Sequence, residues 1–78
     1  MPRFLVECYM PSAGGAFDEA CRRARATEGA RCVWSTHLPG DETALHLFEA
    51  ASASELARAV RRAGLAHDRI VDAVEVTA

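Results

Sequence analysis

Two histidines and one carboxylate have the residue types and the spacing to bind a metal ion. His37 and His46 flank Pro39-Gly40, a pair that favours a tight turn because proline presets φ and glycine tolerates positive φ. If four residues form the loop between two paired strands, His46 lies diagonal to His37, with roughly 7–8 Å between their Cα atoms. Two imidazoles at that separation can share a divalent ion such as nickel, zinc or copper, and Glu7 from a neighbouring strand can fill a further position.

Simpler roles remain open for these residues. His37 can be a solvated residue of the hairpin, and His46 can be a polar residue buried between two subunits. A further carboxylate, Glu49, is expected on the opposite side of its strand from His46. It fits better as a strand-end carboxylate near a helix N-terminus than as a metal ligand.

The three cysteines, Cys8, Cys21 and Cys32, are an odd number without the spacing of a Cys-x-x-Cys motif. A disulfide framework or a zinc knuckle is therefore not expected. We interpret all three as small, buried hydrophobic side chains, and we expect Cys8 and Cys32 to lie on strands too far apart for a disulfide.

Six elements must position these side chains. Strands are expected over Arg3–Met10, Arg31–Leu38, Thr43–Ala50 and Ile70–Val76, and helices over Ala16–Thr27 and Ser52–Ala63. Ser52 followed by Glu55 is a capping box, and Gly64-Leu65 fits a Schellman ending of the second helix. The order βαββαβ in a single domain over residues 1–78 predicts an α+β, ferredoxin-like sandwich, a four-stranded antiparallel sheet with two helices on one face.

The two strands of the central hairpin each divide into two faces. With a loop of two or four residues, odd positions of the second strand share a side with even positions of the third. The side expected to form the core carries Cys32, Trp34, Leu45 and Leu47. The side expected to stay open carries Val33, Ser35, His37, Ala44, His46 and Phe48, with Glu7 on the same face. A three-residue loop or a β-bulge would change this pairing of faces.

The face of the sheet that the helices leave uncovered predicts a homodimer. The first strand places Phe4, Val6 and Cys8 on one side and Leu5, Glu7 and Tyr9 on the other. A chain of 78 residues has a marginal core, and an open face carrying large apolar residues would be unusual in water. We therefore expect a second copy of the chain to cover that face.

Composition excludes several classes of partner. The net charge is −2, with nine basic residues against eleven acidic ones, so a nucleic-acid partner is not expected. The sequence has neither a signal-peptide pattern nor an apolar run long enough for a membrane span. A cytoplasmic location with reduced thiols and no membrane contact is the expectation.

Several runs resemble one known family. Trp34-Ser35, Leu47-Phe48-Glu49-Ala50, Ala63-Gly64-Leu65 and Asp68-Arg69-Ile70 are similar to a small actinobacterial family long described as a domain of unknown function, and Phe4-Leu5-Val6-Glu7 resembles its first strand. At least one member of that family is a nickel-binding protein of ferredoxin-like fold that dimerises. The resemblance implies nickel as the metal.

The sequence also departs from the family pattern. His46 stands where the family carries a cysteine, Cys8 stands where it carries an arginine, and Ala66-His67 replaces a proline-containing pair. If the family cysteine touches metal, His46 can replace it, because imidazole is also a good nickel ligand.

Two functions from different classes follow. The first is a non-enzymatic, metal-binding homodimer. The second is a small-molecule enzyme of the dimeric α+β barrel type, similar to muconolactone isomerases or cofactor-free monooxygenases, in which His46 or His37 is the general base. Its pocket would be lined by Leu5, Tyr9, Trp34 and Phe48. No nucleophile triad, phosphate loop or cofactor motif supports the enzyme, so it rests on the analogy of the fold.

Overall fold

Strands and helices alternate along the chain in the predicted order. The computed structural model describes residues 1–11 and 14–74. Its elements are β1 (Arg3–Tyr9), α1 (Gly15–Arg25), β2 (Arg31–Leu38), the 3₁₀ turn η1 (Pro39–Asp41), β3 (Thr43–Glu49), α2 (Ala53–Arg62) and β4 (Arg69–Ala73). The last strand was expected over Ile70–Val76; it ends at Ala73, Val74 lies outside it, and positions 75 and 76 lie outside the described residues.

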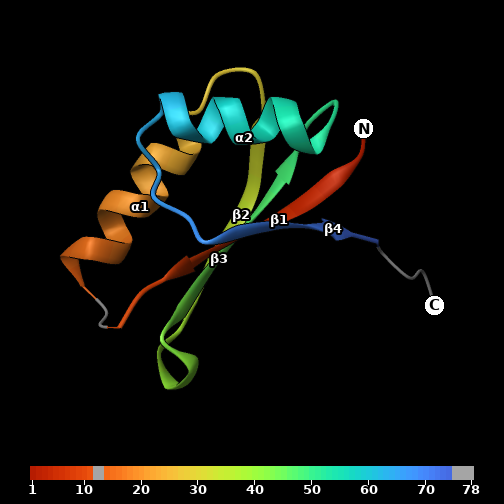
Figure 1. Cartoon of the computed structure of the whole chain (residues 1–78). Coiled ribbons are helices and arrows are strands. Elements are labelled where there is room, and N and C mark those ends of the chain that lie inside the picture. Colours follow the sequence, from red (N-terminus) through yellow and green to blue (C-terminus); the bar gives the residue numbers. More distant parts are fainter. Residues whose placement is uncertain (12–13, 75–78) are drawn as a thin grey trace.

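The strands pair in one antiparallel sheet in the order β2-β3-β1-β4. Both helices lie on the same side of this sheet (Figure 1). The predicted ferredoxin-like α+β fold is therefore confirmed. The two strands that are central in the sheet, β1 and β3, are the ones that carry Glu7 and His46.

Local sequence signals account for both ends of α2. The Ser52 hydroxyl accepts a hydrogen bond from the backbone N–H of Glu55 at 3.1 Å, as an N-cap residue should. At the other end Gly64 adopts φ +74°, its N–H bonds to the carbonyl of Arg61, and the N–H of Leu65 bonds to the carbonyl of Val60. This is the predicted Schellman ending, and it buries Leu65 against the core.

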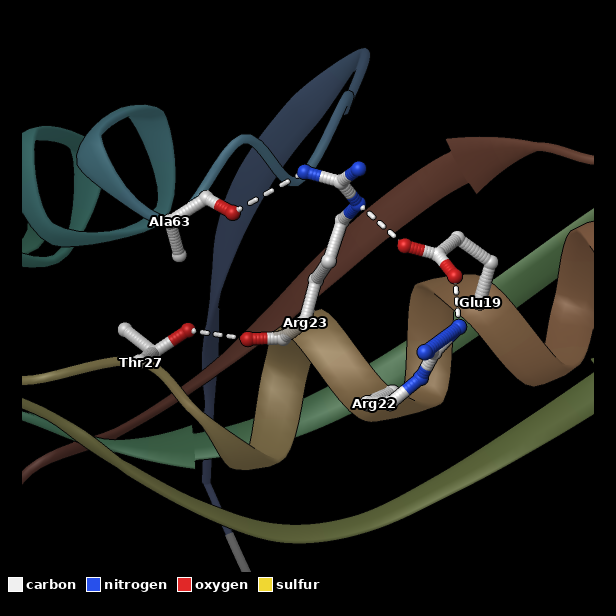
Figure 2. Close-up of polar contacts among 5 residues, drawn as sticks. All are labelled: Glu19, Arg22, Arg23, Thr27 and Ala63. Atoms are coloured by element: carbon white, nitrogen blue, oxygen red, sulfur yellow. Dashed lines mark hydrogen bonds and ion pairs between the residues drawn. The ribbon is translucent and has the colours of Figure 1, made fainter.

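Arg23 ties the two helices together (Figure 2). Its Nε lies 2.9 Å from Oε1 of Glu19 on the same helix, and its Nη1 lies 3.5 Å from the carbonyl oxygen of Ala63, the C-cap residue of α2. Thr27 donates its hydroxyl hydrogen to the carbonyl of Arg23 at 2.9 Å, just beyond the end of α1. One side chain on α1 thus satisfies an unpaired carbonyl at the end of α2.

The core lies between the sheet and the helices, and it corrects the expected division of the hairpin. Phe4, Val6 and Cys8 are buried as predicted, and the β3 residues opposite them are Phe48, His46 and Ala44, which are also buried. The side expected to be open is therefore the side beneath the helices. Trp34, expected in the core, is 44% exposed on the other face.

A β-bulge at Val33 explains part of this difference. Cys32 pairs with Phe48, whereas Trp34 pairs with Leu47, so Val33 is an extra residue on β2. The bulge places Cys32 on the helix side and Trp34 on the open side, although they are two residues apart. The loop itself has four residues, one of the two lengths considered for it, because Leu38 pairs with Thr43.

Candidate functional site

His46 lies at the centre of the sheet and has no exposed surface. It stands opposite Val6 of β1 and Ser35 of β2. Its Nδ1 lies 2.6 Å from the hydroxyl oxygen of Ser35, while its Nε2 is buried and has no hydrogen-bond partner within the described residues. Burial lowers the pKa of His46 below its ordinary value, so the imidazole is neutral near pH 7.

A neutral imidazole in this position has two possible tautomers. If Nδ1–H donates to Ser35, the Nε2 lone pair of His46 is unused, and it can accept a proton or bind a metal ion. If instead the Ser35 hydroxyl donates to Nδ1, a buried Nε2–H is left unpaired. In either case Nδ1 of His46 is held in place by Ser35, and only the first tautomer leaves Nε2 with a lone pair for a ligand.

His37 lies on the same side of the sheet as His46. It pairs with Ala44, so His46 is its diagonal neighbour, as the four-residue loop predicts. Its Nε2 donates to the carbonyl oxygen of Met10 at 3.2 Å, which leaves Nδ1 with the lone pair. The ring of Phe17 from α1 stacks on both imidazoles, with centroid distances of 5.2 Å to His37 and 6.5 Å to His46.

Glu7 is separated from the two histidines, contrary to the expectation. Its neighbour Val6 stands opposite His46 on the helix side, so alternation along β1 turns Glu7 to the open face. There its Oε1 accepts a hydrogen bond from Nε of Arg69 at 2.8 Å. The grouping of all three residues on one face was wrong, because the hairpin places its histidines beneath the helices.

Glu49 also lies on the open face of the sheet and forms hydrogen bonds there with side chains of the same chain. Its carboxylate accepts hydrogen bonds from Arg3 and from Arg31, at 2.8–3.0 Å. The hydrogen bonds from Arg31 and Arg3 lower the pKa of Glu49, and the carboxylate links the end of β3 to both neighbouring strands. This supports the interpretation of Glu49 as a strand-end carboxylate and not as a ligand.

A cleft of about 530 Å³ opens between α1 and β2, which the sequence did not predict. It is lined by Phe17, Asp18, Cys21, Arg22, Arg25 and Ser35. The Ser35 hydroxyl that touches His46 also lies 3.6 Å from the sulfur of Cys32. The signal that could have revealed this cleft is the spacing of Phe17, Cys21 and Arg25, which lie four residues apart on one side of α1.

The cysteines differ in exposure. Cys8 is buried, and burial together with the charge of Asp68 raises the pKa of its thiol to about 11. Burial also raises the pKa of the Cys32 thiol, although the hydrogen bond to Ser35 and the charge of Arg25 oppose this change. Cys21 and Cys32 are half-buried, not enclosed in the core, and all three thiols are free. Neither Cys8 nor Cys32 has the lowered pKa of an activated nucleophile.

A pre-formed metal centre is absent from residues 1–11 and 14–74. No three side chains of His, Cys, Asp or Glu come together there in a way that could hold an ion. The pocket expected for an enzyme is not assembled either, because Phe48 is in the core while Leu5, Tyr9 and Trp34 lie on the other face. No helix in this part of the chain has the length and apolar character needed to cross a membrane.

Comparisons with known proteins support the fold. No protein-family model and no curated protein matches the sequence. Among solved structures, the chain is similar to SCO4226 from Streptomyces coelicolor A3(2), known from a crystal structure analysis, with a TM-score of 0.77 and 22% sequence identity. The match covers 97% of this chain and 99% of that chain. At this identity the similarity establishes the architecture alone, and the resemblance to a nickel-binding family stays a prediction.

Proposed function

We propose that this protein is a small, non-enzymatic homodimer that binds a divalent transition metal at His46. Nickel is the first choice, with zinc and copper as alternatives. The observation that carries the proposal is the environment of His46: Nδ1 is fixed by Ser35, and Nε2 is buried without a partner among the described residues.

This environment suits a metal ligand. Histidines that bind metals commonly donate their other ring N–H to a neighbouring oxygen, which fixes the tautomer and aims the free nitrogen. The lowered pKa of His46 keeps the ring in the neutral form that metals require. A buried polar atom without a hydrogen bond costs about 1–3 kcal/mol, and a bound ion would remove that cost.

His37 is the second ligand in this proposal. It shares a side of the sheet with His46, and one ring, that of Phe17, covers both imidazoles. Movement of Phe17 away from the sheet would open both rings to an entering ion. Glu7 is excluded from the revised set because it faces the other side and is paired with Arg69. Water would fill the remaining positions.

The proposed dimer uses the open face of the sheet. Its centre carries apolar side chains from all four strands, namely Leu5, Trp34, Leu45, Leu47 and Val71. Ion pairs border this patch, Glu7 with Arg69 on one side and Glu49 with Arg3 and Arg31 on the other. Each carboxylate at the border is paired with at least one guanidinium of the same chain, so an identical face could meet the patch without an unpaired carboxylate.

Titration calorimetry with nickel and with zinc on tag-free protein tests the metal site. We expect binding tighter than millimolar, and His46→Asn should weaken it by at least about tenfold. His67→Ala is the matched control, because His67 lies in the loop before β4 and its Nδ1 bonds to the local carbonyl of Leu65. Binding weaker than millimolar, or equal binding by wild type and His46→Asn, would contradict the proposal.

Sedimentation at micromolar concentration tests the dimer. The wild-type chain should have the mass of two copies, and Trp34→Glu should have the mass of one, because the substitution places a charge in the centre of the open face. Arg58→Glu, on the exposed surface of α2, should leave the dimer intact. A wild-type mass of a single chain contradicts the proposed dimer.

A second candidate function is that of a small-molecule enzyme using His46 as a general base. The observation that favours it is the cleft of about 530 Å³ lined by Ser35, whose hydroxyl can pass a proton to the neutral His46. Turnover of small lactones or hydroquinones that is lost in Ser35→Ala and retained in Thr36→Ala would support it. No turnover of such compounds by the wild-type protein would remove it.

A further inference from the structure

Helix α1 and strand β2 lie side by side with matched periods. Phe17 of α1 stacks on His37 of β2. Cys21, one helical turn after Phe17, lines the same cleft as Ser35, which precedes His37 by two residues. Four helical residues advance about 6 Å, and two strand residues advance about 6.6 Å, so the two elements stay in step. One further turn along α1 lies Arg25, and one further step along β2, past the bulge, lies Cys32; the charge of Arg25 acts to lower the pKa of the Cys32 thiol.

The thiols of Cys21 and Cys32 lie where α1 faces β2, and they are near enough for Cys21 to raise the pKa of the Cys32 thiol. The sulfur of Cys32 is 3.6 Å from the Ser35 oxygen, and Cys21 borders the cleft that Ser35 also lines. Both thiols are half-buried; Cys21 lines the cleft, and Cys32 contacts Ser35, which also lines it. Cys8, in contrast, is enclosed in the core.

The arginine side chains that line the cleft favour the binding of a negatively charged group there. Arg25 lines the cleft and makes no hydrogen bond or ion pair within the described part of the chain. Arg22 lines it too, and is paired with Glu19. A guanidinium without an ion-pair partner beside two thiols can offset the negative charge of thiolates when they form.

We propose that Cys21 and Cys32 bind a soft, thiophilic metal ion, and that the ion is monovalent copper. On binding, two S–H bonds break, two S–Cu bonds form, two protons leave to solvent, and no electron is transferred. Thiolates select this ion, and it is satisfied by two ligands, so no cluster of three side chains is required. The complex carries one net negative charge, which Arg25 offsets, and the Ser35 hydroxyl can donate a hydrogen bond to a bound sulfur.

This site is separate from the one proposed at Nε2 of His46. Its ligands are sulfur atoms on the α1 and β2 side of Ser35, and its ion is soft and monovalent, whereas the His46 site takes a divalent ion. Failure of one proposal does not imply failure of the other, because cysteine variants test this site and His46→Asn tests the other.

Anaerobic competition between the reduced full-length protein and a chromophoric copper(I) chelator tests the proposal. We expect one copper per chain and an ultraviolet absorption band from thiolate-to-copper charge transfer. Cys21→Ser and Cys32→Ser should each weaken binding by about a hundredfold, since a single thiolate remains. Arg25→Gln should weaken it several-fold, and Arg58→Gln, an arginine on the outer surface of α2, should not change it.

Control variants decide between this pair and other ligands. Cys8→Ala and His46→Asn should each retain one copper per chain. Unchanged binding in the Cys21→Ser, Cys32→Ser double variant, or equal loss in Cys8→Ala, overturns the proposal. If a serine variant does not fold, alkylation of the accessible thiols in the native protein replaces it. Copper binding that survives alkylation of both Cys21 and Cys32 then overturns the proposal equally.

Discussion

The hydroxyl oxygen of Ser35 lies 2.6 Å from Nδ1 of His46, and it is the one polar contact of that buried imidazole within the described residues. The two residues are direct partners across β2 and β3, so the sheet register itself sets this distance. The contact orients His46, and it joins the interior of the sheet to the cleft beside α1.

Ser35→Ala should destabilise the protein more than a neighbouring substitution of similar size. Removing the hydroxyl leaves both ring nitrogens of His46 without a partner, which costs about 1–3 kcal/mol in the free energy of unfolding. Thr36→Ala is the control, because Thr36 faces the open side and pairs with Leu45. Urea unfolding monitored by Trp34 fluorescence measures the free energy of unfolding of both variants. Equal losses in the two variants would show that the bond to His46 contributes nothing.

The stability of the metal-free protein should fall as the pH falls below 6.5. Burial lowers the pKa of His46 in the folded state, so below its ordinary value of 6.5 the unfolded chain takes up a proton that the folded chain does not. Stability from this source is fully present above that pH and is lost on acidification. Urea unfolding midpoints measured from about pH 7.5 to about pH 5.5 should decline in wild type and less steeply in His46→Gln.

Measurements in that pH range also separate the contribution of His46 to the pH dependence of stability from the contribution of Glu49. Hydrogen bonds from Arg31 and Arg3 lower the pKa of Glu49, so its contribution is present above the ordinary carboxyl value of 4.5 and is lost only as the pH falls below it. An identical decline in wild type and His46→Gln above about pH 5.5 would exclude His46 as the cause.

Thiol labelling should divide the cysteines into two classes. Cys8 is 3% exposed and the pKa of its thiol is raised to about 11, so it should not react with a disulfide reagent in the native protein near pH 8. Cys21 and Cys32 are half-buried and should react. Mass spectrometry should find two labels on the native chain and three after unfolding. Rapid labelling of Cys8 in the native protein would contradict its burial on the core face of β1.

Gly64→Ala should cost more stability than Gly40→Ala. Gly64 has φ +74°, and a Cβ there would lie 2.5 Å from Nη1 of Arg23, the side chain that joins the two helices in Figure 2. The strained conformation alone costs about 1 kcal/mol, and displacement of Arg23 would add to it. A Cβ at Gly40 meets nothing within 4 Å. Thermal unfolding of the two variants measures the difference, and equal melting temperatures would contradict it.

Local signals in the sequence predicted the fold well because each acts over a few residues. Ser52 caps α2 and the turn at Gly64 ends it through hydrogen bonds between residues at most five positions apart. The alternation in β1 likewise identified Phe4 and Val6 as core residues. With these boundaries known, right-handed connections leave a few arrangements of the sheet, and the ferredoxin-like one among them is observed.

The choice between the two sides of the hairpin needed information that is not local. Parity correctly grouped Ser35, His37 and His46, yet a large apolar set on the other side, including Trp34 and Leu47, made that side the apparent core. The helices cover the side with the histidines because Val6 of β1 stands opposite His46. Glu7 was misplaced for the same reason, and its partner Arg69 comes from a strand 62 residues away.

The bulge at Val33 also changes what the edge of the sheet offers to other chains. Strand β2 is an outer strand, with one of its two sides unpaired in the sheet order. An unpaired edge is a template on which strands of other molecules can add, and an extra residue breaks the even spacing of N–H and C=O groups that such addition requires. The residue that turns Trp34 away from the core therefore also protects this small sheet against growth into fibrils at its β2 edge.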